Sequence, residues 1–228
     1  MLTLYTAIGH LTFKKTTSGK PIALVINNGQ EYGLSEYELV LWSCLAFQIL
    51  QIHELKAAYN KRLPTKETTT PLPFSHYLNR LLLRGLITKG EGMTGVDALY
   101  RLLGELYITP IDNPFLPRLF TCIGLYLKGK IQRNDFPRYL KKVPVTPIEE
   151  TILKLSRTVS LSTAELLGCM EQRKKPKNDG DVWAFLYQNP ADTYRTLADQ
   201  AQLCHIQYPV LQAIGNLYLN QQISFEKY

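Results

Sequence analysis

The sequence predicts an α+β fold that is mainly helical, with short β-hairpins. Apolar residues recur at three- and four-residue spacing over several stretches, which is the pattern of amphipathic helices. Short stretches rich in β-branched residues stand between glycine, asparagine and proline, which is the pattern of strands joined by turns. With 228 residues, the chain is long enough for one large domain or two small ones, with a buried core.

The first 33 residues are expected to form a β-hairpin extension. His10 to Lys15 is predicted as one strand, the segment TTSGKP as a turn, and the segment IALVI as the returning strand. The second strand ends at Asn27-Asn28-Gly29, where Asn-Gly favours the positive φ angles of a tight turn.

A helix is predicted to start at Ser35, because Ser35 and Glu38 have the spacing of a capping box. The apolar spacing continues as far as Ile52, and a second amphipathic stretch runs from His53 to Leu63. The segment 64–74 carries three prolines and four threonines, so it is predicted to be a loop.

The next helix is expected at Ser75–Arg84, with Leu78 and Leu81 on its buried face. Gly85 fits the left-handed residue after the helix, and it leads into a strand at Leu86–Lys89. The opposite face is expected to be exposed and carries His76, Asn79, Arg80, Leu83 and Arg84.

A regular wing would turn at Gly90-Glu91-Gly92 and return at once as a strand. Here a helical stretch from Thr94 to Gly104 delays the return, so the returning strand is expected at Leu106–Thr109. Prolines at 110, 114 and 117 then mark a boundary.

A second unit is predicted to open at Thr146, with Pro147 at the first helical position and Glu149 three residues after the cap. This start lies 111 residues after the first (146 minus 35), and Glu54 then falls on Glu165. The residues around Gly85 can be laid on those around Gln221 with an offset of 136 (221 minus 85). A duplicated architecture is expected.

The chain is basic, with a net charge of +7 and a pI near 9.1, and therefore attracts polyanions. Its cations form two clusters, each of which has the alternative interpretation of a solvated surface. The first cluster holds Lys128, Lys130, Arg133, Arg138, Lys141 and Lys142, and the second holds Arg173, Lys174, Lys175 and Lys177.

Several function classes find no support. No apolar run is long enough for a membrane span and no signal peptide is recognisable, so a cytoplasmic protein without a membrane partner is expected. The four scattered cysteines predict buried thiols rather than a metal site, and no cofactor is expected. Phosphate-binding glycine loops and hydrolase motifs are missing, so no enzyme is expected. The aromatic segment Trp183–Tyr187 is interpreted as core rather than as a pocket lining.

Two sets of residues carry a family resemblance. Thr193-Tyr194-Arg195-Thr196-Leu197-Ala198, followed by Ile206, Val210, Leu217 and Ile223, resembles the pattern of bacterial helix-turn-helix regulators. Leu78, Leu81, Gly85, Leu86 and Ile87 resemble the recognition-helix end of winged-helix regulators. The resemblance implies winged-helix-like domains at 34–110 and 145–228, joined by a basic helical linker at 111–144.

This resemblance implies a bacterial or mobile-element transcriptional regulator that binds double-stranded DNA as a homodimer. Its second helix would enter the major groove, where Arg80 would contact guanine and Asn79 adenine. Phosphate contacts would come from Ser75, His76, Arg84, Lys89 and the two basic clusters.

Two other functions stay open. The corresponding helix face of the second unit carries no Lys or Arg, and is expected to hold Tyr208, Gln212, Gly215, Asn216 and Leu219. Such a face suits a protein partner, as in the tandem winged-helix scaffold subunits of chromosome segregation. A plasmid replication initiator is a further alternative within the DNA-binding class.

Overall fold

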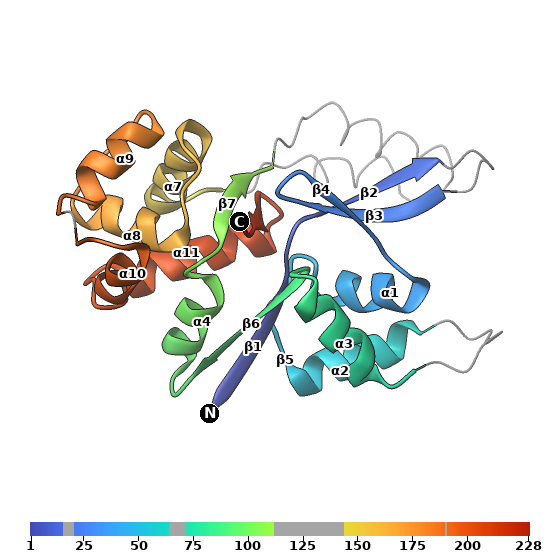
Figure 1. Cartoon of the computed structure of the whole chain (residues 1–228). Helices are drawn as coiled ribbons and strands as arrows, with labels where there is room; N and C mark the ends of the chain where they lie inside the picture. The colour runs from blue at the N-terminus through green and yellow to red at the C-terminus, as the bar shows by residue number, and fades with distance from the viewer. Residues whose placement is uncertain (16–20, 64–71, 112–143, 190) are drawn as a thin grey trace.

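A computed structural model describes residues 1–15, 21–63, 72–111, 144–189 and 191–228. Over these residues the fold is α+β, with helices around three small antiparallel sheets. Figure 1 shows two groups of helices, one toward each side of the molecule. Nearly all of the linker expected at 111–144 lies outside the described residues.

The first group is built on a sheet whose central strand is the first of the chain. Strand β1 (Leu2–Ala7) lies between β5 (Leu50–Gln51) and β6 (Ile87–Gly92) and is antiparallel to both, with Leu4 opposite Gln51 and Gly90. Three helices pack against this sheet: α1 (Glu36–Leu45), α2 (Ile52–Arg62) and α3 (Phe74–Leu83). Their shared core includes Leu41, Leu45, Leu55, Leu81 and Ile87.

The predicted N-terminal hairpin exists, but residues 1–33 do more than form an extension. Strands β2 (His10–Lys15), β3 (Pro21–Asn27) and β4 (Gln30–Gly33) form a separate sheet in the order β2-β3-β4. Asn28 and Gly29 take φ angles of 48° and 71° in the turn between β3 and β4, as the Asn-Gly pair predicted. Strand β1, in contrast, belongs to the sheet of the first helical group.

The helix expected from Ser35 to Ile52 is shorter than predicted. Ser35 and Glu38 form the predicted capping box, but α1 ends at Leu45. Phe47 adopts a φ of 57°, in the left-handed region, and Leu50 and Gln51 then pair with β1. Ile49 therefore lies in the connection between α1 and β5, and Ile52 is the first residue of α2, so the two do not share one helix.

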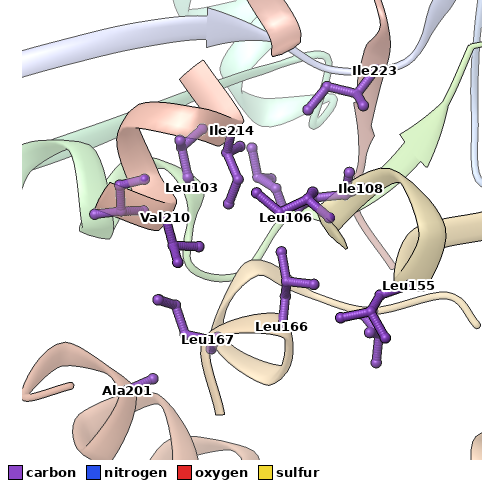
Figure 2. Close-up of a cluster of buried hydrophobic side chains, with 14 of the residues drawn as sticks. Leu103, Leu106, Ile108, Leu155, Leu166, Leu167, Ala201, Val210, Ile214 and Ile223 are labelled. Atoms are coloured by element: carbon purple, nitrogen blue, oxygen red, sulfur yellow. The ribbon is translucent and has the colours of Figure 1, made fainter. Parts of the chain in front are cut away.

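The second group is mainly helical. It contains α7 (Pro147–Thr158), α8 (Thr163–Glu171), α9 (Asp179–Leu186), α10 (Tyr194–Gln202) and α11 (Gln207–Leu219), and a sheet formed by β7 (Tyr107–Pro110) and β8 (Ile223–Glu226). Figure 2 shows its core, in which Leu103 and Leu106 meet Leu166, Val210 and Ile214. Leu103 comes from α4 (Gly95–Leu103), so this helix joins the second core.

The expected wing of the first unit is wrong in two respects. Strand β7 pairs with β8 rather than with β6, so it is not a returning strand. Strand β6 continues straight through Gly90 and Gly92 instead of turning there. A Cβ at Gly90 would lie 2.3 Å from Leu102 N, and one at Gly92 would lie 2.3 Å from Ala98 N. The two glycines therefore let α4 lie directly on β6.

The duplicated architecture stays a prediction, and the two groups share several local features. Strand β7 is central in the second group as β1 is in the first, because it pairs with β8 and forms a bridge from Tyr107 to Ser162. The capping box of Gln51 and Glu54 recurs at Ser162 and Glu165, 111 residues later (162 minus 51). Helices α3 and α11 end alike: Leu86 N donates to Leu81 O, and Gln222 N donates to Leu217 O, both at 2.9 Å.

One buried hydroxyl joins the two groups. Tyr218 of α11 is 2% exposed, and its hydroxyl accepts a hydrogen bond from Phe47 N at 3.1 Å and donates to Leu45 O at 3.2 Å. Thr6 Oγ1 of β1 lies 3.0 Å from the same oxygen. Gly9 N also donates to Phe225 O at 2.8 Å. The end of α1, the centre of the first sheet and the last helix are thus held at one point.

The close contact between β6 and α4 is testable with one methyl group. Gly90→Ala should lower the free energy of unfolding by about 2 kcal/mol or more, because backbone atoms of α4 occupy the space of the new Cβ. Urea unfolding followed by circular dichroism measures the change.

The matched control is Gly95→Ala, since a Cβ at Gly95 has no atom within 4 Å. It should change the free energy of unfolding by less than about 1 kcal/mol. Equal effects of the two substitutions would contradict the packing of α4 on β6.

Candidate nucleic-acid interface

Helix α3 presents a polar face to solvent, as the sequence predicted. Tyr77, Leu78 and Leu81 are buried in the first core, which fixes the rotation of the helix. The exposed positions recur at three- and four-residue spacing and are Ser75, His76, Asn79, Arg80 and Leu83. Helix α3 carries no acidic residue, so this face is neutral to positive.

A buried carboxylate connects the start of α1 to the end of α3. Glu38 is 1% exposed, and its Oε2 accepts hydrogen bonds from Ser35 N at 2.9 Å and Ser35 Oγ at 2.8 Å. Its Oε1 lies 3.3 Å from Arg80 Nε and 3.3 Å from an Arg84 terminal nitrogen. The capping box that starts α1 therefore also binds both arginines of the candidate face.

These contacts set the charge state of Glu38. Burial alone would raise its pKa, but the hydrogen bonds from Ser35 and the charges of Arg80 and Arg84 outweigh burial. The net effect is a pKa below the ordinary value of 4.5. The folded state thus favours the ionised carboxylate.

The two arginines differ in how much of each remains available. Arg84 donates to Glu38 and to Gly33 O at 2.7 Å, and its guanidinium lies 5.7 Å from the centre of the Tyr32 ring. Its side chain is 25% exposed, whereas that of Arg80 is 51% exposed. Arg84 therefore links the end of α3 to β4. Arg80 contacts Glu38 only through Nε, and about half of its side chain stays exposed to solvent.

Of the other predicted contact residues, those within the described ranges do not gather around α3. Lys89 is exposed on β6 and pairs with Glu91 at 2.8 Å. Arg173, Lys174 and Lys175 are exposed between α8 and α9, in the other group of helices in Figure 1. The Lys174 amine lies 5.1 Å from the centre of the Phe185 ring. The cluster of Lys128, Lys130, Arg133, Arg138, Lys141 and Lys142 lies outside the described residues.

Helix α11 ends as α3 does but has a different surface. Tyr208, Gln212, Asn216 and Leu219 are exposed and Gly215 is half-buried, so the predicted face is confirmed. The helix has no charged residue. At the equivalent position, Leu83 is 89% exposed and Leu219 is 48% exposed. The basic side chains of the pair are thus confined to α3.

Searches for related proteins leave the site without a precedent: no protein-family description, curated protein or solved structure matches the chain. None of the helices described here is long and apolar enough to cross a bilayer. Within the described residues, no group of three or more His, Cys, Asp or Glu side chains is arranged to hold a metal ion. Cys44 and Cys169 are buried free thiols.

The interpretation of Trp183–Tyr187 as core was wrong for Ala184, which is exposed, and for Trp183. Its side chain is 63% exposed, whereas Leu186 is 7% exposed. Two signals were present in the sequence: α9 is short, and Asn178 starts it three residues before Asp181. Because a helix of that length buries only one side, an aromatic residue on the other side faces solvent.

The lowered pKa of Glu38 predicts a specific loss of stability in acid. A carboxyl whose pKa is lower in the folded than in the unfolded state stabilises the fold above its unfolded pKa, and that contribution is lost as the pH falls through the folded pKa. Glu38→Gln should lower the free energy of unfolding at pH 7 by about 1–3 kcal/mol and flatten its decline below about pH 5.

Urea unfolding at a series of pH values provides the measurement. Glu36→Gln, which changes an exposed acid in the same first turn, should follow the wild-type curve. A Glu38→Gln curve parallel to wild type over the whole acid range would contradict the assigned role.

Proposed function

We propose that the protein binds double-stranded DNA through the exposed face of α3 and acts as a bacterial or mobile-element transcriptional regulator. The observation that carries the proposal is the acid-free polar face of Ser75, His76, Asn79 and Arg80 on a helix fixed at its end by Arg84. Such a regulator would act in the cytoplasm, without a cofactor and without catalysis.

The order of elements supports two winged-helix-like units. In each group, a helix that buries one side, α3 or α11, runs into a strand at the edge of a small sheet. We infer that β1 and β7 take the place of the returning wing strand, since each lies between the partners that this strand would pair with. Helix α3 would then be the recognition helix of the first unit.

The chemistry of the face suits the major groove. The amide of Asn79 has the donor and acceptor that adenine requires, and the terminal nitrogens of Arg80 can reach O6 and N7 of guanine. The contact of Arg80 Nε with Glu38 at 3.3 Å would orient the guanidinium before DNA arrives. Ser75 and His76, at the start of α3, are placed for phosphate contacts, and the basic residues of 128–142 would add charge.

A homodimer fits this proposal, with two copies of α3 about 34–36 Å apart on one face of the duplex. Arg84 is left out of the contact set, because Glu38 and Gly33 O already occupy its guanidinium.

Loss of the two base-reading side chains should abolish specific binding. Asn79→Ala combined with Arg80→Ala should weaken binding to a duplex selected from a random pool by about 30-fold or more, since each bidentate contact contributes about 1–3 kcal/mol. Fluorescence anisotropy at two salt concentrations measures the loss, and higher salt should weaken wild-type binding.

The matched control is Gln212→Ala with Asn216→Ala, which removes two exposed polar side chains from the equivalent helix α11. It should bind the selected duplex as wild type does. Failure to select any sequence, or an equal loss in the control, would refute recognition by α3.

A second candidate function is a protein scaffold, as in the tandem winged-helix subunits of chromosome segregation. It is favoured by the 89% exposure of Leu83 and by the uncharged face of α11, where Tyr208 is 60% exposed. A plasmid replication initiator stays within the first proposal, because it would also read DNA with α3.

A substitution at Leu219 separates the two functions. If the α11 face docks on protein, Leu219→Lys should weaken self-association or partner binding by about 10-fold or more, since a charge would enter an apolar contact. Sedimentation equilibrium measures self-association. The same variant should leave DNA affinity unchanged or slightly raised, and a loss of DNA binding would place α11 in the DNA contact.

A further inference from the structure

An open cleft of about 610 Å³ lies in the second group, where α9 faces the start of α10 and the strand β7. Five of its eleven lining residues are aromatic: Tyr107, Trp183, Tyr187, Tyr194 and Tyr228. Trp183 is 63% exposed and Tyr228 is 64% exposed. Large exposed aromatic side chains around a cleft are more typical of a binding surface than of a hydrophobic core.

The sequence of α9 builds one wall of this cleft. Asp179, Val182 and Trp183 are three and four residues apart, so they share one side of the helix. The side chain of Asn178 accepts a hydrogen bond from Asp181 N at 2.9 Å, which fixes the first turn. The ring of Trp183 packs against Tyr187, with ring centres 4.5 Å apart.

The cleft is acidic although the chain as a whole is basic. Glu165, Asp179 and Asp192 line it, and its lining contains no Lys, Arg or His. None of the three acids belongs to an ion pair within the described part of the chain. Glu165 is 8% exposed; Ser162 N and the Tyr187 hydroxyl each donate to it at 2.9 Å. A negative charge with hydrogen bonds but without a cation, beside aromatic rings, favours a cationic occupant.

The tyrosines of the wall are held neutral. Burial first, and then the charge of Glu165, raises the pKa of Tyr107 and of Tyr187. A tyrosine of ordinary pKa is already neutral at pH 7, so both rings offer uncharged faces there. The same acids repel phosphate, so the cleft does not take part in the DNA binding proposed for α3.

We propose that this cleft binds an arginine side chain from an exposed segment of a protein partner. A planar guanidinium can stack on the indole of Trp183 and the exposed ring of Tyr228, while Asp179, Asp192 and Glu165 supply the opposite charge. The site is independent of α3, which lies in the other group of helices (Figure 1).

The chain provides its own reporter for this site. It contains two tryptophans, and Trp42 is 4% exposed in the core of the first group. The two indole N–H signals in a ¹⁵N-correlated NMR spectrum therefore report on the cleft and on an internal reference. Titration with the tripeptide Gly-Arg-Gly should move the Trp183 signal saturably and leave the Trp42 signal in place.

Two controls identify the charge as the cause. Gly-citrulline-Gly has the same shape without the charge, and should bind about tenfold or more weaker. Asp179→Asn with Asp192→Asn should weaken Gly-Arg-Gly binding by about fivefold or more, whereas Asp199→Asn, an exposed acid outside the cleft, should have no effect.

Two results would overturn the proposal. One is a Trp183 signal that does not move up to about 10 mM Gly-Arg-Gly, a concentration that detects even millimolar affinity. The other is equal binding of the citrulline tripeptide, which would make the cleft an uncharged aromatic site. Because DNA binding is measured separately on α3 variants, failure here leaves the proposed function untouched.

Discussion

The antiparallel pairing of β1 with β6 is the constraint on which the rest of the first group depends. Six residue pairs, from Leu2 with Gly92 to Ala7 with Ile87, place the start of the chain at the centre of the sheet. Since β1 fills the position between β5 and β6, the chain after β6 is free to continue into α4. Helix α4 then packs on the glycines of β6, and its Leu103 lies in the second core. In the second group, β7 likewise lies between two partners, because it pairs with β8 and forms a bridge to Ser162.

Two buried polar networks fix the positions of α3 and α11 relative to the sheets. The Tyr218 hydroxyl ties α11 to β1 and to the end of α1, and Glu38 ties the start of α1 to Arg80 and Arg84 of the α3 segment. An unpaired polar group in either place would cost the free energy of its desolvation, so each network stabilises one geometry. As a result α3 and α11, each of which is followed by a strand, keep a fixed relation while their exposed chemistry differs.

The sequence predicted what depends on local chemistry. Ser35 with Glu38, Thr146 with Glu149 and the left-handed Gly85 act within a few residues, so their positions were correct, and so was the exposed face of α3. The pairings of β1 with β6 and of β7 with β8 join residues far apart in the chain, and no local pattern specifies them. For the same reason, the sequence did not predict the roles of Gly90 and Gly92, which depend on the close approach of α4. Nor did it predict the role of Arg84, which depends on its hydrogen bonds to Glu38 and Gly33. Trp183 was misassigned because aromatic content alone does not tell which side of α9 is buried.

Hydrogen exchange with and without DNA tests most directly the proposal that α3, and not α11, contacts DNA. The protein is incubated in deuterated buffer with a duplex that it selects, and mass spectrometry follows the peptides of α3 and of α11. If α3 contacts the duplex, exchange should slow in the peptide that spans Phe74–Leu83 and stay unchanged in the one that spans Gln207–Leu219. Slower exchange in α11 alone, or in neither helix, would contradict the proposal.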